Sequence, residues 1–350
     1  MENIIETSFG KTGSGEAKLY TLSSDRISAG FTDYGCILAR LTVPDRNGVP
    51  RSVVLGYDSA EGYEAGTSFL GATVGRYAGR IGGAGFGLFG RRFTLSENDG
   101  ENHLHGGFSK RFYSVRREGD SLVFSLVSPD MDEGFPGELR LSVRVAVYGN
   151  TLRIGYEAET DAPTVLNITN HAYFDLSGNG AAGHRLKVFA DRYAETEGMI
   201  PTGRILPVAG TPLDFTCPRP IIDALDAPEL AATRGLDHSF VLPETEGKLL
   251  RDAALLSSEE TGITLLCRTT QPTVHVYTAG FLDLDSAAQG FGKPLLRHGG
   301  VCLETQHLPD SPNRPEFPGV TLMPGERFRE VTEFVFGTMP EYHGCPEEEE

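Results

Sequence analysis

Strict alternation of apolar and polar residues constrains the fold of this chain more than any other feature of its sequence. Between residues 139 and 147 every odd position is apolar, and the even positions are mostly polar. After Gly149-Asn150 the pattern resumes in the opposite phase, with apolar residues at the even positions of 152–158. Two such runs around a Gly-Asn pair predict a β-hairpin whose turn residues, Gly149 and Asn150, both adopt a positive φ.

Short alternating or apolar runs recur along the rest of the chain, whereas helical patterns are few. Six further segments are predicted strands: residues 36–43, 122–127, 263–268, 274–278, 301–306 and 330–336. Only residues 228–233 indicate one or two helical turns. The chain has 43 glycines and 21 prolines to supply turns, and its strands do not alternate with helices. The pattern therefore predicts an all-β fold, a sandwich or a barrel-like sheet.

The chain shows no internal boundary, and its charge is strongly acidic. No 20–50-residue repeat and no linker-like stretch divides it, so we expect one domain over residues 1–345. The four glutamates at its end predict a disordered acidic tail at residues 346–350. A net charge of −17 gives no general attraction for phosphate backbones or anionic lipid, so no nucleic-acid partner is expected.

Targeting features and cysteine usage indicate a cytoplasmic protein. The first residues lack the basic and apolar regions of a secretory signal. No segment approaches the roughly 18 consecutive apolar residues of a membrane span, so no membrane association is expected. The five cysteines are odd in number and widely spaced, without a C-x-x-C pair, which argues against a thiolate zinc site. Free thiols in a reducing cytoplasm fit this usage best.

Two glycine- and histidine-rich segments interrupt the β pattern. Residues 75–81 place Arg76 and Arg80 among glycines, where the backbone can approach a ligand and guanidinium groups can donate to it. Taken alone, this segment is more typical of a glycine-rich turn with surface arginines. Downstream, His103 and His105 would face the same way on a strand and invite a metal interpretation. Two histidines still need a third ligand and an ordered outer shell, so no metal is expected.

A third segment, residues 167–178, centres on a histidine. His171 lies between asparagines and aromatic residues, and most single histidines of this kind have only a structural role. Here the amide and hydroxyl neighbours could fix the tautomer of His171. Tyr173 or Phe174 could form an apolar wall for a sugar ring.

Two carboxylates complete the candidates. Asp237 lies at the entry of a strand and, by spacing alone, is an ordinary turn carboxylate. Glu304 shares one face of its predicted strand with Cys302 and Gln306. These neighbours surround it too well for a plain solvent-exposed carboxylate, so Glu304 could be a tuned general base.

Together these segments resemble the aldose 1-epimerase family, also called the galactose mutarotases. The most specific motifs are Asn170-His171-Ala172-Tyr173-Phe174 and Leu303-Glu304-Thr305-Gln306-His307. The resemblance spans most of the chain, through residues 75–81, 102–107, 167–178, 235–242, 273–283 and 302–318. It implies a large antiparallel β-sandwich of the galactose mutarotase-like type, with few short helices and an open, polar cleft of sugar size.

The resemblance also implies a role for each candidate. Glu304 falls on the position of the general base, and His171 falls on that of the general acid. His105 and Arg80 match positions that hydrogen-bond the sugar, and Asp237 matches the carboxylate that binds sugar hydroxyls.

Two positions depart from the family pattern. Gly79 stands where many relatives have Asn, and His275 stands where relatives often have Gln. Both match substrate-binding positions, so the departures affect the expected preference among sugar hydroxyls and leave the expected chemistry unchanged.

The implied reaction interconverts the α and β anomers of free aldohexoses such as D-glucose and D-galactose. One carboxylate and one imidazole suffice for it, so no cofactor is expected, and the expected partner is a small sugar bound by a monomer or a homodimer. Three alternatives stay open. Asp237 and Glu304 could form the carboxylate pair of a glycoside hydrolase. Arg76 and Arg80 could bind the phosphate of a hexose-phosphate 1-epimerase relative. The chain could also be a non-catalytic carbohydrate-binding homologue.

Overall fold

The computed structural model describes residues 4–245, 247–287, 292 and 294–339, so the predicted tail at 346–350 lies outside the described residues. Strands form most of its regular structure, and the strand pairings of the described part are antiparallel. The prediction of an all-β antiparallel fold is therefore confirmed.

The largest sheet has nine strands and contains the predicted hairpin. Its order is β11 (Ser114–Glu118), β12 (Ser121–Ser128), β13 (Leu139–Tyr148), β14 (Thr151–Thr160), β28 (Phe328–Thr338), β24 (Ile263–Thr269), β23 (Arg251–Ser257), β18 (Arg185–Val188) and β21 (Arg219–Pro220). β13 and β14 pair from Leu139↔Thr160 to Tyr148↔Thr151, as the change of phase predicts.

The turn of this hairpin differs from the prediction. Gly149 has a φ of +53°, whereas Asn150 is not among the described residues with positive φ. A positive φ at only the first turn residue is typical of a type II′ turn, which needs glycine at that position and no special residue after it.

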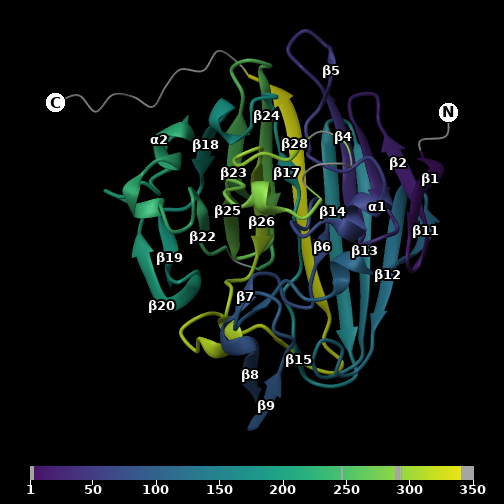
Figure 1. The fold of residues 1–350 in the computed structure, drawn as a ribbon, viewed down its shortest axis with the longest axis vertical. Coiled ribbons are helices and arrows are strands. Elements are labelled where there is room, and N and C mark those ends of the chain that lie inside the picture. Colours follow the sequence, from purple (N-terminus) through teal and green to yellow (C-terminus); the bar gives the residue numbers. More distant parts are fainter. Residues whose placement is uncertain (1–3, 246, 288–291, 293, 340–350) are drawn as a thin grey trace.

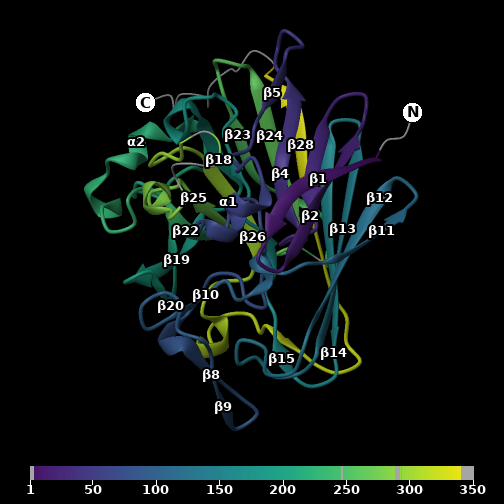
Figure 2. The ribbon, with the colours of Figure 1, turned by 45° about the vertical axis from the view of Figure 1, so that its right-hand side comes forward.

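Two smaller sheets complete the fold. The five-stranded sheet has the order β1 (Ile4–Thr12), β2 (Gly15–Ser23), β3 (Ser28–Thr32), β4 (Ile37–Pro44) and β5 (Pro50–Ser52). The six-stranded sheet has the order β17 (Tyr173–Phe174), β26 (Val301–Gln306), β25 (Thr273–Tyr277), β22 (Asp237–Val241), β19 (Arg192–Glu197) and β20 (Ile200–Pro207). In Figures 1 and 2, β1–β4 lie on the side of β12 and β13, and β19 and β22 lie on the opposite side.

The core lies between the nine-stranded sheet and the two smaller ones. One apolar cluster of buried side chains contains residues from all three sheets. Phe31 of β3 lies 6.1 Å, between ring centroids, from Phe124 of β12. On the other side, Phe174 of β17 lies 4.9 Å from Phe334 of β28. This arrangement is the two-layer packing of a β-sandwich, as predicted.

The six-stranded sheet has one apolar face and one polar face because side chains alternate along each strand. Val274 and Val276 of β25, and Leu303 of β26, belong to the core cluster. The intervening residues, which include His275 and Glu304, line a cavity on the other face. The alternation that buries the core therefore also gathers polar side chains from separate strands at one surface.

Short elements close the ends of the sandwich. Four two-stranded ladders pair β6 (Thr73–Val74) with β16 (Thr169–Asn170), β7 (Arg80–Ile81) with β10 (His103–Leu104), β8 (Gly85–Leu88) with β9 (Arg91–Thr94), and β15 (Thr164–Val165) with β27 (Thr321–Leu322). The α-helices are α1 (Ala60–Ala65) and α2 (Ile222–Leu225), and the predicted turn at 228–233 is a 3₁₀ helix at Pro228–Leu230. Within the described ranges, no helix is long and apolar enough to cross a membrane.

The cysteines follow the sequence prediction in part. Cys36, Cys267 and Cys302 are free and buried. Cys217 takes part in a disulfide bond, so the expectation of free thiols is wrong for this residue. Burial raises the pKa of the Cys36 thiol to about 12, which keeps it protonated and unreactive.

Candidate active site

A cavity of about 370 Å³ lies on the polar face of the six-stranded sheet. This volume is within the range of about 300–1,000 Å³ that is usual for small-molecule sites. The predicted site residues all line it: Gly79, Arg80, His105, His171, Asp237, His275 and Glu304. The structure thus brings together residues that are up to 225 positions apart in the chain, counted from Gly79 to Glu304.

Glu304 and His171 form a buried acid–base pair at this cavity. The Nε2 atom of His171 lies 3.6 Å from Oε1 of Glu304, and the two side chains are 6% and 3% exposed. Glu304 comes from β26, whereas His171 directly follows β16. The backbone of His171 is fixed on both sides, since its N–H donates to Ala72 O and its carbonyl accepts from Gly71 N.

Aromatic rings hold the imidazole of His171 in place. Tyr173 stacks on it with ring centroids 5.0 Å apart and an interplanar angle of 18°. The ring of Phe69 is also nearly parallel to it, with the centroids 6.2 Å apart and an interplanar angle of 22°. The Nδ1 atom of His171 lies 3.5 Å from the Sγ atom of Cys302. The ring therefore presents Nε2 to the cavity in a fixed orientation.

The expectation that an amide fixes the tautomer of His171 is wrong. The Asn170 amide donates to Gly71 O, and the Asn167 amide donates to Ala78 O and His307 O. Both amides therefore donate to backbone carbonyl groups. The partner at Nδ1 of His171 is the Cys302 thiol.

His105 is held as a neutral hydrogen-bond donor. Its φ of +62° turns the chain out of β10, and its Nδ1 accepts from Gly79 N–H at 3.1 Å. Because Nδ1 provides a lone pair, the neutral ring carries its proton on Nε2. Burial, reinforced by the nearby charges of His171 and Arg80, holds the pKa of His105 well below its usual range. His105 therefore offers an N–H group to a sugar hydroxyl.

The same tautomer makes this cluster a poor metal site. Possible ligand atoms of His105, His171 and Glu304 lie within 4.8 Å of one another. A metal needs a lone pair on the histidine nitrogen that faces it, but the Nε2 atom of His105 carries the proton. Binding a cation would require the loss of the hydrogen bond from Gly79. The donor set thus does not fit a metal.

The two histidines of the His-x-His motif point to different surroundings. The strand covers only His103–Leu104, so the same-face rule does not extend to His105. The ring of His103 packs edge-on against Phe135, and its Nδ1 lies 2.7 Å from Ser96 O. His103 is therefore structural, whereas His105 lines the cavity.

Gly79 contributes its backbone. It has a φ of +81°, and a Cβ atom at this position would lie 2.8 Å from Cγ of Pro309. No ordinary side chain fits there unless Pro309 moves. The contribution of Gly79 to the site is the N–H group that fixes the tautomer of His105.

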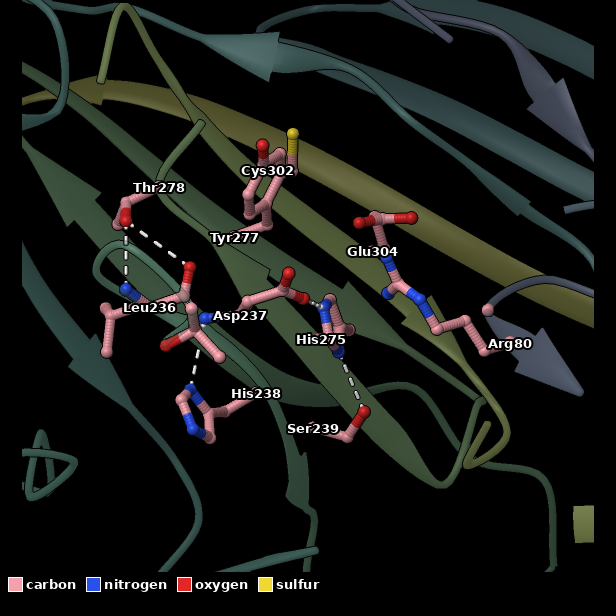
Figure 3. Close-up of polar contacts among 12 residues, drawn as sticks. Arg80, Leu236, Asp237, His238, Ser239, His275, Tyr277, Thr278, Cys302 and Glu304 are labelled. Carbon is pink, nitrogen blue, oxygen red and sulfur yellow. Dashed lines mark hydrogen bonds and ion pairs between the residues drawn. The ribbon is translucent and has the colours of Figure 1, made fainter. Parts of the chain in front are cut away.

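Asp237, His275 and Ser239 form a chain of hydrogen bonds across β22 and β25 (Figure 3). Oδ1 of Asp237 lies 2.8 Å from Nε2 of His275, and Nδ1 of His275 lies 2.8 Å from Oγ of Ser239. Asp237 and Ser239 point the same way because they are two residues apart on one strand. Ser239 pairs with His275 in the strand register.

The contact between Asp237 and His275 favours a carboxylate on Asp237 and a protonated imidazole on His275. Burial would raise the pKa of Asp237, but the hydrogen bond and charge of His275 outweigh it and lower that pKa. Burial would likewise lower the pKa of His275, but the hydrogen bond and charge of Asp237 outweigh it and raise that pKa. Asp237 is therefore a carboxylate, able to accept hydrogen bonds from sugar hydroxyls through its remaining oxygen lone pairs.

The two predicted arginines have different environments. Arg80 lines the cavity, and its Nε lies 2.7 Å from Oδ2 of Asp99, with the Arg80 side chain 19% exposed. Arg76 is 1% exposed, and its guanidinium donates to the carbonyls of Ser128, Pro129, Pro136 and Gly137. Arg76 is thus a buried structural residue, so it cannot bind the phosphate of a substrate.

Gln306 is a cavity residue that the sequence analysis did not assign. It is 1% exposed, lines the cavity, and its Oε1 has no hydrogen-bond partner within the protein. A buried acceptor of this kind is costly until a donor reaches it. Its position two residues after Glu304, on the same strand face, was the signal that could have identified it. Ser239 could have been found in the same way from Asp237.

Aromatic residues around the cavity were predicted only in part. Tyr173 lines it, as expected, but Phe174 points to the core and packs on Phe334. Phe69 was not predicted, because it lies in a loop with a φ of +55°. Asp285 anchors that loop by accepting from the N–H groups of Thr67 and Ser68, at 2.9 and 2.6 Å.

The arrangement combines proton transfer with hydroxyl recognition. Glu304 and His171 can exchange protons with one end of a bound molecule. Asp237 accepts hydrogen bonds, whereas neutral His105 donates them. Such a cavity suits a polyhydroxylated ligand that undergoes acid–base chemistry.

Comparison with known proteins gives consistent matches across the chain. The sequence profile of the family described as aldose 1-epimerase matches residues 18–335. Galactose mutarotase of Rattus norvegicus is 37% identical over 345 residues, covering 96% of this chain and 99% of that protein. The aldose 1-epimerase of Escherichia coli K12 is 36% identical over 332 residues, covering 91% of this chain and 95% of that protein.

Solved structures agree with these matches. An aldose epimerase homologue from C. elegans has a TM-score of 0.86 at 29% identity, covering 93% of this chain and 100% of that chain. Galactose 1-epimerase from Lactobacillus acidophilus has a TM-score of 0.84 at 28% identity, covering 96% of this chain and 98% of that chain.

Proposed function

The chain belongs to the aldose 1-epimerase family, and from this premise we propose that it is a mutarotase acting on free aldohexoses such as D-glucose and D-galactose. The observation that carries the proposal is the buried pair of Glu304 and His171, 3.6 Å apart, in a cavity lined by hydroxyl-binding groups. Binding alone would not require an acid–base pair, which argues against a non-catalytic homologue.

The proposed mechanism uses two proton transfers. Glu304 removes the proton of the C1 hydroxyl while His171 donates the proton on Nε2 to the ring oxygen. The C1–O5 bond breaks, and the open aldehyde turns about its C1–C2 bond. Closure on the other face of the carbonyl reverses both transfers, so the enzyme and the sugar regain their protons. The reaction needs no oxidant, nucleotide or metal.

The other polar residues would hold the sugar while its anomeric end moves. Asp237 would accept from hydroxyl groups, and neutral His105 and Arg80 would donate to them. Gln306, whose Oε1 has no partner within the protein, would accept from a further hydroxyl. Positioning of this kind keeps the reacting atoms aligned with Glu304 and His171.

Two rival reactions fit the cavity less well. A glycoside hydrolase places its two carboxyl groups on either side of the glycosidic bond, whereas here Glu304 is paired with His171 and Asp237 is paired with His275. A hexose-phosphate epimerase needs a basic pocket, and Arg76 is buried among carbonyls. Release of an aryl alcohol from an aryl glycoside, or binding of a hexose phosphate in preference to the free hexose, would support the corresponding rival.

The organisation and location of the protein also stay proposals. One apolar cluster extends from Ile4 to Phe336, which supports a single domain over residues 1–345. The three buried free cysteines support a cytoplasmic location, whereas the disulfide bond at Cys217 argues for an oxidising compartment. A monomer or a homodimer is expected in solution.

The purified protein should accelerate the mutarotation of freshly dissolved α-D-glucose and α-D-galactose. Polarimetry measures the approach of the optical rotation to equilibrium, with heat-inactivated protein as the control. Because Glu304 and His171 carry out both proton transfers, the rate should be the same after treatment with a chelator. Activity that disappears with the chelator and returns with a divalent ion would contradict the mechanism.

Replacing His275 with Gln should change the ratio of kcat/KM for glucose and galactose by about tenfold, with a smaller change in kcat. The amide can still reach Asp237, but it cannot carry the charge that His275 shares with that carboxylate. Ser239→Ala is the matched control, because it removes one end of the chain and keeps the bond between His275 and Asp237. An unchanged sugar ranking with a collapsed kcat would show that His275 acts at the anomeric centre.

A further inference from the structure

The partner of the proposed general acid is a thiol, and this choice has chemical consequences. We propose that Cys302 is a positioning residue that holds His171 through Nδ1 but binds the Nδ1 proton only weakly, so that His171 gives up its Nε2 proton readily. This inference rests on the mutarotase function proposed above and adds the residue that sets the acid strength of that site.

The imidazole of His171 contacts two side chains of β26, one at each ring nitrogen. Sγ of Cys302 lies 3.5 Å from Nδ1 of His171, within hydrogen-bond range for sulfur, and Nε2 of the same ring lies 3.6 Å from Glu304. Cys302 and Glu304 are two residues apart on β26, so the strand presents both to the imidazole. Cys302 has an exposure of 0% and His171 has one of 4%, so bulk water does not replace the thiol.

The thiol of Cys302 can stay in contact with Nδ1 of His171 in both protonation states of the imidazole. Sulfur is a weak donor through S–H and a weak acceptor through its lone pairs. Burial, together with the charges of Glu304 and Asp237, holds the pKa of Cys302 well above its usual range, so the thiol keeps its proton. When His171 is charged, Nδ1–H donates to sulfur. When His171 has given its proton to the sugar, Nδ1–H can stay in place.

The strength of this contact determines how readily the proton leaves. Histidines of many catalytic and metal sites donate to a carboxylate or a carbonyl, and such partners raise the basicity of the ring. A more basic ring is a weaker acid after protonation. Sulfur orients the imidazole but raises its basicity less than an oxygen partner does. The stacked rings of Tyr173 and Phe69 restrain the imidazole further.

Other groups that face His171 must be considered in any pH experiment. Glu304 approaches Nε2, and the ring of His105 lies 5.2 Å away, edge-on. Tyr277 of β25 lies edge-on at 6.3 Å, and Tyr173 stacks at 5.0 Å. Burial raises the pKa of both tyrosines and holds the pKa of His105 well below its usual range, so these three rings keep their neutral form during the experiment.

The test is the pH profile of kcat/KM for glucose in Cys302→Ala, with Cys267→Ala as the matched control. Protonation of the base Glu304 at low pH should give the acid limb, and loss of the His171 proton at high pH should give the alkaline limb. Without a partner at Nδ1, the charged ring is less stable, so the alkaline limb of Cys302→Ala should move by about one pH unit to lower pH. The control removes a buried thiol of β24, far from the cavity, and its limb should coincide with that of the parent.

Two further variants keep the test decisive. Cys302→Val fills a similar volume without a polar group and should show the same shift, even if the alanine variant does not fold. Cys302→Ser places a stronger oxygen acceptor at Nδ1, so its alkaline limb should move to higher pH than that of the parent. A limb that stays in place in the apolar variants, or that moves equally in the serine variant or the Cys267 control, overturns the role of Cys302.

The two proposals fail in different ways. If the parent enzyme shows no mutarotation at any pH, the proposed function itself is wrong. If the parent is active with a bell-shaped profile and only the shift in Cys302→Ala is missing, the function stands and the role of Cys302 is wrong.

Discussion

Glu304→Gln should lower kcat for mutarotation by about 10²- to 10⁴-fold, which corresponds to roughly 3–5 kcal/mol of barrier. The amide has nearly the shape of the carboxylate but cannot accept the proton of the C1 hydroxyl. Because Glu304 is buried at 2% exposure beside His171, water cannot easily substitute as the base. Polarimetry at saturating glucose measures the loss, and KM should change much less than kcat.

The control for this variant is Glu330→Gln. Glu330 is also a buried glutamate, 3% exposed, but it lies on β28 and pairs with Lys248. Its replacement tests the cost of an amide at a buried carboxylate position without touching the cavity. Thermal melting should show both variants folded. A folded Glu304→Gln enzyme with a rate within about tenfold of the parent would be incompatible with a general base at this position.

His171→Asn should cause a loss of similar size, about 10²- to 10⁴-fold in kcat, because the ring oxygen then lacks its acid. Asparagine keeps a polar group near Cys302 and is smaller than the imidazole, so the cavity should stay open. Removal of the C1 proton assists ring opening only when the ring oxygen is protonated. The double variant should therefore lose much less than the product of the two single losses.

The double variant separates a coupled pair from two independent contributions. kcat is measured for the parent, both single variants and the double variant under one set of conditions. A double loss equal to the product of the single losses would show that Glu304 and His171 act in separate steps. A folded His171→Asn enzyme with nearly parental kcat would remove the proposed acid.

Alternation along single strands made much of this structure predictable. The hairpin of β13 and β14 follows from residues 139–158 alone, and the polar face of β26 follows from the alternation of Glu304 and Gln306 with Leu303 and Thr305. Local pattern succeeds here because side-chain direction in a strand depends only on position along it. The same rule could have identified Ser239 and Gln306.

Contacts between distant segments were beyond the sequence pattern. The approach of His171 to Glu304 depends on the packing of β16 against β6 and on the register of β26. His103 and His105 diverge because the chain leaves the strand between them with a positive φ at His105. The roles of these residues were predicted from the family resemblance. Side-chain alternation along a single strand does not predict them.

Burial was the other unpredicted quantity. Arg76 and Arg80 have similar sequence surroundings, yet one guanidinium is enclosed by carbonyl groups and the other lines the cavity. The difference arises from the loop at residues 128–137, which folds over Arg76. No pattern within residues 75–81 predicts contact with a loop that begins 52 positions after Arg76.

The close approach of Pro309 to Gly79 restricts the order in which this site can diversify. A Cβ atom at position 79 would lie 2.8 Å from Cγ of Pro309, so any side chain there would collide with the proline ring. The proline must therefore change first, and that change alone adds no side chain at position 79. An evolutionary or laboratory search that accepts only single improvements would stay with glycine, so a library aimed at new sugars must vary positions 79 and 309 together.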